Sequence, residues 1–280
     1  MRILTMLLLL CLAMTNAQAF SKKRKVIKAE PVPVVYAVWN VANSELIDSH
    51  NENMVHSMAS ITKLMTVYTT LKSGVDLQER VTVVGREGSS KIRSGMQVSR
   101  QELIDLTLVS SDNLAARTLA ETSPQGYDSF IESMNSHARS LGMYDTKYED
   151  ATGLLASNVA SANDLMKLVV AASKYEAYHT AAMKPSTAIT VTFKRKEQTV
   201  VANATNQFAG KMDIQVAKTG FTSKAGRCLT MMFREAGNTY ALVVMGASTP
   251  PQRTKIVEQL IARAKTSPTR VWSYSENKYF

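Results

Sequence analysis

Three short motifs carry side chains that could cooperate in nucleophilic catalysis. Ser60 precedes Lys63 by three positions in the stretch ASITKLMT, whose apolar residues have helical spacing. Positions three apart share a helix face, so the hydroxyl and the amine would point the same way. Ser111 and Asn113 belong to a Ser-Asp-Asn triplet, and Lys218 opens the only Lys-Thr-Gly triplet in the sequence. Each match alone is more often structural than catalytic, and it is the ordered set that indicates an active site.

The chemistry that suits this set is acyl transfer. A serine hydroxyl is a poor nucleophile until a base within hydrogen-bond reach removes its proton. Lys63 can be that base only while its amine is neutral, which burial and a nearby positive charge such as Lys218 would favour. Ser111 would pass the proton on to the leaving group. Positioned proton transfer of this kind typically contributes about 10² to 10⁴ in rate.

The remaining motif residues predict how an extended peptide would be held. Asn113 would bind the substrate backbone, and Lys218 with Thr219 would attract a carboxylate. Gly220 has no side chain to block a peptide, so the strand edge at Gly220 and Phe221 could pair with one. The backbone N–H groups of the nucleophilic serine and of Phe221 would form an oxyanion hole, in which one donor is commonly worth about 10² to 10³ in rate.

The motifs lie in a chain with strand signals at both ends and helical spacing between them. Period-two patterns and β-forming residues predict strands over 34–41, 45–49, 189–193, 200–202, 214–218, 228–234 and 240–246. Helical spacing and cap signals predict helices over 58–73, 99–109, 113–122, 127–141, 162–172 and 253–264. This order predicts one sheet flanked by helices, with a helical lobe inserted.

The N-terminal residues have the form of a secretory signal. A single positive charge precedes an almost continuous apolar run from Ile3 to Met14, and the Ala-Gln-Ala sequence that follows suggests cleavage after Ala19. The run is too short to cross a bilayer, and no later stretch approaches the roughly 18 to 20 apolar residues of a spanning helix. We therefore expect a signal peptide at 1–19, no transmembrane segment and an exported, soluble mature protein.

Charge and composition limit the classes of binding partner that the sequence favours. The net charge of +10 favours anionic partners such as nucleic acid, anionic lipid or acidic wall polymers. Aromatic and basic residues are not interleaved as in single-strand binders, which argues against nucleic acid. Basic residues within 22–28, in a linker at 20–33, could associate with the membrane surface or the wall. The histidines share no ligand spacing, so no metal site is expected. Cys228 is the only cysteine after Ala19, so no internal disulfide is expected either.

Three segments closely resemble the active-site segments of low-molecular-mass penicillin-binding proteins, the serine D-alanyl-D-alanine peptidases that trim peptidoglycan. They are ASITKLMT, LVSSDNLAA and VAKTGFTSKAGRCL, which carry the Ser-x-x-Lys, Ser-x-Asn and Lys-Thr-Gly elements in that order. Further similar text lies in DATGL (150–154), SANDLMKL (161–168) and ATNQF (204–208). The likeness runs from about Val35 to Ala264, which places a peptidase domain at 34–265.

The resemblance implies an α/β fold of the α+β type, as in penicillin-binding proteins and β-lactamases, in which an antiparallel sheet is flanked by helices and carries an inserted all-helical lobe. It also implies no metal and no organic cofactor, peptidoglycan as the substrate and a periplasmic location. β-Lactam antibiotics would be covalent inhibitors, because they mimic D-alanyl-D-alanine. By the same resemblance, Arg253 would help Lys218 and Thr219 hold a carboxylate.

Two departures from many carboxypeptidases resemble the endopeptidase branch of the family, which cuts the cross-link between D-alanine and the diaminopimelate of the next stem. Many carboxypeptidases have glycine in the middle of the second motif, where this chain has Asp112. They also carry a β-rich domain ending in an amphipathic anchor, where this chain has the short tail 266–280. The expected function is thus a penicillin-sensitive D-alanyl-D-alanine endopeptidase that remodels the cell wall through a Ser60 acyl-enzyme.

Three alternatives stay open. A D-alanyl-D-alanine carboxypeptidase would use the same residues on a different leaving group. A class A β-lactamase would need a glutamate after the second motif to activate the deacylating water, and Glu149, in KYEDATGL, is the nearest candidate. A non-catalytic, penicillin-binding wall protein would keep the fold without turnover.

Overall fold

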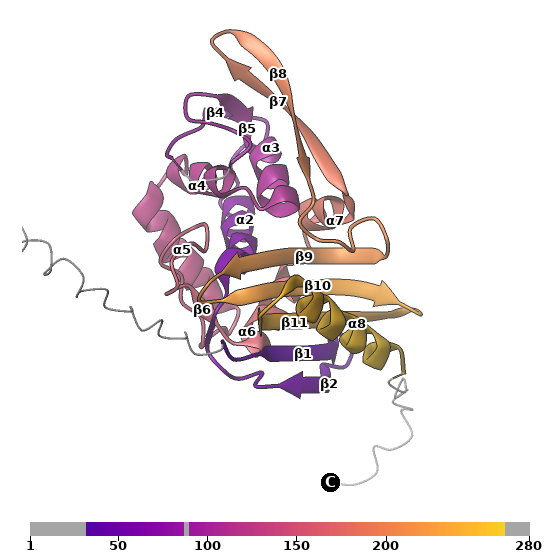
Figure 1. Ribbon diagram of the computed structural model, residues 1–280. Helices are drawn as coiled ribbons and strands as arrows, with labels where there is room; N and C mark the ends of the chain where they lie inside the picture. Colours follow the sequence, from indigo (N-terminus) through magenta and orange to yellow (C-terminus); the bar gives the residue numbers. More distant parts are fainter. Residues whose placement is uncertain (1–31, 87–89, 267–280) are drawn as a thin grey trace, which may run out of the picture. The chain divides into compact units, whose positions relative to one another are not determined.

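The first and last strands of the domain pair in one antiparallel sheet of five strands (Figure 1). The structure is a computed structural model in which residues 32–86 and 90–266 are described. The predicted signal peptide and nearly all of the predicted linker and tail lie outside these residues. The strand order is β2-β1-β11-β10-β9. These strands are β1 (Val35–Asn40), β2 (Glu45–His50), β9 (Asp213–Thr222), β10 (Gly226–Glu235) and β11 (Asn238–Ala247).

Helices cover both faces of this sheet. Strand β1 directs Ala37 and Trp39 into the larger core cluster, where α6 (Ala162–Ala172) packs. The alternate residue Val38 enters a second cluster beneath α8 (Pro250–Thr266), which crosses the sheet in Figure 1. Successive strand residues point to opposite faces, so apolar side chains on both sides of a strand require a cover on each face.

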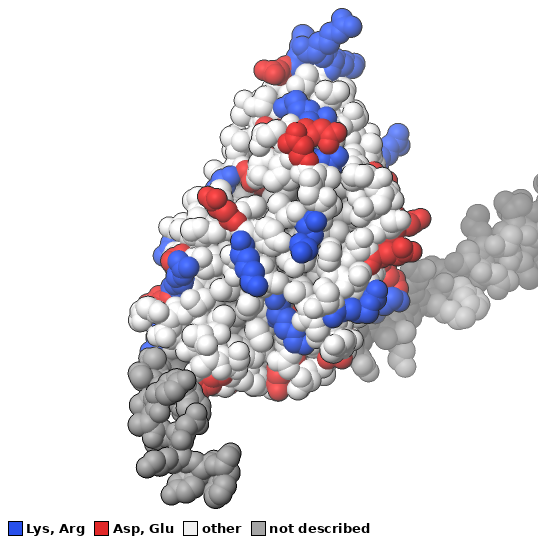
Figure 2. All heavy atoms as spheres, turned by 180° about the vertical axis from the view of Figure 1, so that it is seen from behind, with Lys and Arg blue, Asp and Glu red and all other residues white. Residues whose placement is uncertain are grey.

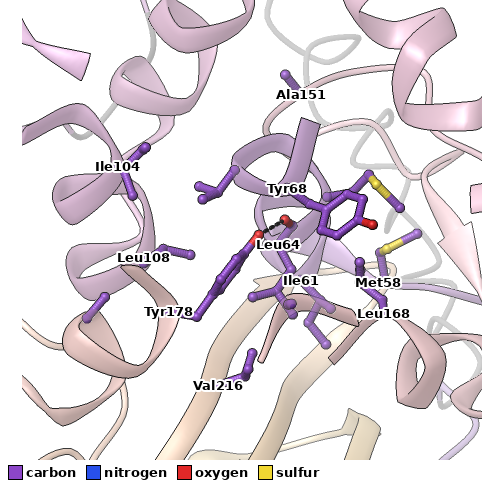
Figure 3. Packing of buried hydrophobic residues seen from close by; sticks show 14 of the residues in the cluster. Met58, Ile61, Leu64, Tyr68, Ile104, Leu108, Ala151, Leu168, Tyr178 and Val216 are labelled. Carbon is purple, nitrogen blue, oxygen red and sulfur yellow. Dashed lines mark hydrogen bonds between the residues drawn. The ribbon is translucent and has the colours of Figure 1, made fainter. Parts of the chain in front are cut away.

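The helical lobe is built around α2 (Thr62–Lys72), of which nine residues are buried. A helix buried on almost every side needs neighbours all round it, and α2 contacts α4, α5, α6 and the π-helical turn η2. Figure 3 shows this core, in which the Tyr178 hydroxyl donates to the Leu64 carbonyl oxygen at 2.7 Å. The remaining helices are α3 (Arg100–Asp105), η2 (Leu106–Ser110), α4 (Asn113–Glu121), α5 (Tyr127–Ser140) and α7 (Glu176–Met183).

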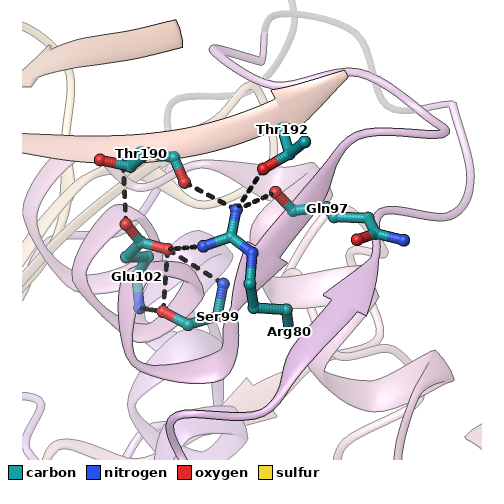
Figure 4. A network of polar contacts seen from close by, with 6 residues as sticks. All are labelled: Arg80, Gln97, Ser99, Glu102, Thr190 and Thr192. Carbon is teal, nitrogen blue, oxygen red and sulfur yellow. Dashed lines mark hydrogen bonds and ion pairs between the residues drawn. The ribbon is translucent and has the colours of Figure 1, made fainter. Parts of the chain in front are cut away.

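A second, four-stranded sheet in the order β4-β5-β7-β8 borders the helical lobe. Its parts are joined by Arg80, whose guanidinium donates to the Gln97 carbonyl oxygen at 2.8 Å and to Thr192 Oγ1 at 3.1 Å, and pairs with Glu102 (Figure 4). The strands are β4 (Arg80–Thr82), β5 (Gln97–Ser99), β7 (Ser186–Phe193) and β8 (Lys196–Asn203). A two-stranded sheet joins β3 (His56–Ser57) to β6 (Val159–Ala160).

The predicted sheet flanked by helices, with a helical lobe, is present. The prediction of a single sheet is wrong, because the strands predicted over 189–193 and 200–202 pair with each other and with β5 in the second sheet, as β7 and β8. Three local features also differ from expectation. The helix predicted from residue 58 begins as a 3₁₀ turn, η1 (Ala59–Ile61). The helix that follows the capping box of Ser99 and Glu102 ends in the π-helical turn η2. Strands β4 and β5 and helix α7 were not predicted, because three-residue strands and an eight-residue helix leave little periodicity to detect.

The charged surface is mixed rather than single-signed on the face shown in Figure 2, where Lys and Arg side chains are dispersed among Asp and Glu. Charges of opposite sign pair at several points of the surface, for example Lys265 with the partly buried Glu235 at 3.0 Å. Within 32–86 and 90–266, no helix has the length and apolar character needed to cross a membrane.

Candidate active site

Ser60 lies in η1, immediately before α2, where the backbone takes an unusual path. Its neighbour Ala59 has φ of +48°, a left-handed conformation that costs a non-glycine residue about 1–2 kcal/mol. Gly153 fixes this path from the other side: a Cβ on Gly153 would lie 1.9 Å from the Ala59 carbonyl oxygen. The position of Ser60 thus depends on a close contact between two segments more than 90 residues apart in the sequence.

Lys63 is fully buried at the start of α2 and connects three segments. Its Nζ donates to Ser60 Oγ at 2.9 Å, to Asn113 Oδ1 at 2.7 Å and to the Thr152 carbonyl oxygen at 2.7 Å. The structure therefore brings together the first two motifs, and it adds a carbonyl from the DATGL segment.

The Thr152 carbonyl is held by a turn organised around the buried carboxylate of Asp150. Its Oδ1 accepts from the backbone N–H groups of Thr152 and Gly153, both at 2.5 Å, and its Oδ2 accepts from the Leu155 N–H at 2.7 Å. Asn158 anchors the turn to the helix, because its Nδ2 donates to Thr62 Oγ1 at 3.0 Å and to the Asp150 carbonyl at 2.9 Å. The sequence indicated DATGL only as a segment that resembles the peptidase family, and it predicted no role for this segment.

The second motif lies between two helices. Ser111 follows the π-helical turn with φ of +61°, and Asp112 caps α4 by accepting from the Ala115 N–H at 3.0 Å. The Asp112 carboxylate also accepts from Ser90 Oγ and the Lys91 N–H, both at 2.7 Å, and so ties Ser90 and Lys91 to this turn. These bonds leave Ser111 and Asn113, on either side, lining the same cleft.

The third motif lies on β9, the last strand of the five-stranded sheet. Lys218 is 1% exposed, and its Nζ donates to the Thr219 carbonyl at 2.9 Å. Burial, and then the charge of Lys63, lower the pKa of Lys218 well below its ordinary value. Thr219 Oγ1 donates to Thr205 Oγ1 at 2.6 Å. A Cβ on Gly220 would lie 3.0 Å from the Ser60 backbone nitrogen, so no other residue fits there without displacing its neighbours.

These residues meet at a cleft of about 380 Å³. Of the predicted site residues, Ser60, Ser111, Asn113, Thr219, Gly220, Phe221 and Arg253 line it. Lys63 and Lys218 are buried beside it. Sequence reasoning missed the other lining residues, namely Leu154, Thr205, Thr222, Arg227 and Pro250. Leu154 and Thr205 belong to the DATGL and ATNQF segments, which were the available signal.

The lowered pKa of Lys218 predicts a pH-dependent contribution to stability. Between that lowered folded value and the unfolded value of 10.5, the unfolded chain binds more protons than the folded chain. The free energy of unfolding should therefore rise with pH in this window, by up to about 1.4 kcal/mol per pH unit. Denaturant unfolding of the wild type and of Lys218→Met from pH 7 to 9.5 measures this: the wild type should gain stability relative to the variant. Parallel curves would contradict the burial of a titrating amine at this position.

Other candidate groups lie outside this chemistry. Burial raises the pKa of the Cys228 thiol to about 12, which keeps the thiol protonated. Over residues 32–86 and 90–266, no cluster of three His, Cys, Asp or Glu side chains is placed to hold a metal ion. Glu149 is exposed and pairs with Lys147 at 2.5 Å, away from the cleft lining.

A protein-family model and several known proteins match most of the chain. The family model of D-alanyl-D-alanine carboxypeptidases matches residues 27–249. A D-alanyl-D-alanine endopeptidase of Pseudomonas aeruginosa is 37% identical over 211 residues, which make up 72% of this chain and 67% of that protein. A D-alanyl-D-alanine endopeptidase of Escherichia coli K12 is 34% identical over 218 residues, 75% of this chain and 70% of that protein.

A solved structure shares the fold. Penicillin-binding protein D2 from Listeria monocytogenes, in its ampicillin-bound form, superposes with a TM-score of 0.72 at 28% sequence identity. The match covers 82% of this chain and 96% of that chain. It confirms the predicted fold class, an antiparallel sheet flanked by helices with a helical lobe.

Proposed function

This chain belongs to the D-alanyl-D-alanine carboxypeptidase family of serine peptidases, and we propose that it is an endopeptidase that hydrolyses peptidoglycan cross-links through an acyl-enzyme on Ser60. The contact of 2.9 Å between Lys63 Nζ and Ser60 Oγ, beside the cleft and against the edge strand β9, carries the proposal. The two endopeptidase relatives, at 37% and 34% identity, favour this branch.

The first half of the reaction forms an ester. A neutral Lys63 amine takes the proton of Ser60, whose Oγ attacks the carbonyl carbon of the D-alanine before the scissile bond. The backbone N–H groups of Ser60 and Phe221 stabilise the oxyanion. Strand β9 runs close to that point, because a Cβ on Gly220 would lie 3.0 Å from the Ser60 nitrogen. Ser111 delivers its proton to the departing amine as the carbon–nitrogen bond breaks, and it takes the proton held by Lys63 in return, which leaves the Lys63 amine neutral again.

The second half regenerates the enzyme. Water attacks the ester carbonyl and gives a proton to Lys63. The carbon–oxygen bond to Ser60 then breaks, Ser60 Oγ takes that proton from Lys63, and the shortened stem leaves with a new carboxylate. Asn113 holds the substrate backbone in both halves. Lys218, Thr219 and Arg253 hold the carboxylate next to the scissile amide, and a β-lactam enters by the same contacts and acylates Ser60.

Specific observations bear on two of the alternatives, the carboxypeptidase and the class A β-lactamase. A carboxypeptidase would use the same nucleophile and base, and the family model bears that description; the two activities differ in the leaving group. A class A β-lactamase needs a glutamate at the nucleophile, whereas Glu149 is exposed and paired with Lys147. Export through a signal peptide at 1–19, a periplasmic location and peripheral contact through basic residues in 22–28 complete the proposal.

The deciding experiment is product analysis with purified cross-linked peptidoglycan dimers and with pentapeptide monomers. The mature protein, from Phe20 onward, should convert dimers to monomers, and Ser60→Ala should not. A penicillin added beforehand should block the wild type. If dimers stay intact while pentapeptides lose their terminal D-alanine, the carboxypeptidase alternative replaces the endopeptidase proposal. If neither substrate changes while penicillin still labels Ser60, the protein is a penicillin-binding wall protein without turnover.

A further inference from the structure

Two guanidinium groups lie at the same cleft as Ser60, and the proposed reaction uses only one of them. Arg253, in the first turn of α8, and Arg227, in β10, both line the cleft. Helix α8 covers the face of the sheet that holds β9 and β10 (Figure 1). Arg253 has the role of holding the carboxylate beside the scissile bond, which leaves Arg227 without a function.

Arg227 is held in place by its neighbour across the strands. It pairs with Phe221 in the register of β9 and β10, and its Cζ lies 3.6 Å from the centroid of the Phe221 ring. A guanidinium stacked on an aromatic ring is oriented, while its N–H groups stay available at the edge of the plane. Its Nε is buried and has no hydrogen-bond partner among the described residues. A buried donor without a partner is costly, and a ligand that accepts from it removes that cost.

The charges around Arg227 are uncompensated. Among the described residues that line the cleft, none is Asp or Glu, and neither Arg227 nor Arg253 forms an ion pair within that part of the chain. Burial, and then the charge of Arg227, lower the pKa of Arg253, so the two cations repel each other. An arrangement of this kind suits a ligand with more than one negative charge.

We propose that Arg227 binds a second carboxylate of the leaving group and thereby selects cross-linked substrates over pentapeptides. This inference rests on the proposed acyl transfer at Ser60. The D-alanine released from a pentapeptide has one carboxylate, which Arg253 and Thr219 hold. A stem released from a cross-link carries further carboxylates beyond the one next to its amine. The stacked guanidinium of Arg227 provides the planar pair of donors that fits such a group.

The test uses three synthetic substrates with the same acyl part ending in D-alanine. Their leaving groups are D-alanine, diaminopimelate joined through the amine of its D-centre, and the same diaminopimelate with its distal carboxylate amidated. The last two differ by one carboxylate only. The wild type should show a kcat/KM about 10- to 100-fold higher for the acid than for the amide, the factor typical of a hydrogen bond to a charged group. Arg227→Gln should reduce this ratio to within about 3-fold.

Two controls keep the ratio interpretable. Arg234→Gln removes an exposed arginine from the other end of β10 and should keep the wild-type ratio. Titration with a penicillin counts the functional molecules of each variant. If Arg227→Gln does not fold, Arg227→Lys replaces it in the test. Lysine retains the charge but lacks the planar guanidinium, so the ratio of kcat/KM for the acid to kcat/KM for the amide should lie between the wild-type value and one.

The outcomes separate this inference from the endopeptidase proposal. A wild type without preference for the acid, or an Arg227→Gln variant that keeps the preference, overturns the assignment of Arg227. Intact cross-linked dimers together with a clear acid preference overturn the endopeptidase proposal and leave Arg227 as a carboxylate-binding residue. Cleaved dimers without the acid preference support the endopeptidase proposal and overturn the assignment of Arg227.

Discussion

Replacing Lys63 by methionine should lower the second-order rate of acylation by a penicillin by about 10² to 10⁴, the range typical of positioned general-base catalysis. Methionine retains the length and apolar stem of the side chain in a site that is fully buried. What disappears is the amine 2.9 Å from Ser60 Oγ, and with it the group that would accept the serine proton. Stopped-flow acylation with a fluorescent penicillin measures the rate directly.

The same substitution has a structural consequence that must be measured alongside the rate. Asn113 Oδ1, at the cleft, and the buried Thr152 carbonyl both lose their 2.7 Å donor, and an unsatisfied buried acceptor such as the Thr152 carbonyl costs about 1–3 kcal/mol. Lys72→Met is the matched control, because it makes the same change at an exposed position of the same helix. It should leave the acylation rate within 2-fold. A Lys63→Met protein that is folded and acylates within about 3-fold of the wild type would disprove the role of Lys63 as base.

Replacing Gly153 by alanine should displace the nucleophile Ser60, although Gly153 belongs to a different segment of the chain. The new Cβ would lie 1.9 Å from the Ala59 carbonyl oxygen and 2.9 Å from the Ser60 nitrogen, so one backbone must move. The φ of +81° adds the strain of a left-handed alanine. Together we expect about 2–4 kcal/mol of lost stability. Because a misplacement of 1 Å can cost about 10²-fold in rate, acylation should fall by at least about that factor.

Gly142→Ala separates the effect of the steric clash from the effect of the left-handed backbone conformation. Gly142 has a similar φ of +72°, but nothing lies within 4 Å of the Cβ it would gain. This variant should lose only about 1–2 kcal/mol from backbone strain and keep its acylation rate. Thermal unfolding and penicillin acylation of the two variants side by side provide the comparison. Equal effects in both would show that the contact between Gly153 and the Ala59–Ser60 backbone does not position the nucleophile.

The sequence by itself determined the family and most of the local structure. The order of Ser60-x-x-Lys63, Ser111-x-Asn113 and Lys218-Thr219-Gly220 indicated the family, and the match of the family model to residues 27–249 confirms it. Local patterns were sufficient for the capping box of Ser99 and Glu102, which involves residues only three apart, and for the longer helices and strands. Such signals depend on neighbours in the chain, and a sequence presents them directly.

Only the tertiary structure decided how these residues meet. The left-handed Ala59 and the close approach of Gly153 meet across roughly 90 residues of sequence. Arg227 and Phe221 stack because the register of β10 on β9 places them opposite each other, and α8 then brings Arg253 to the same cleft. No local pattern encodes these contacts, because their energies arise only after the sheet and the helical lobe have packed together.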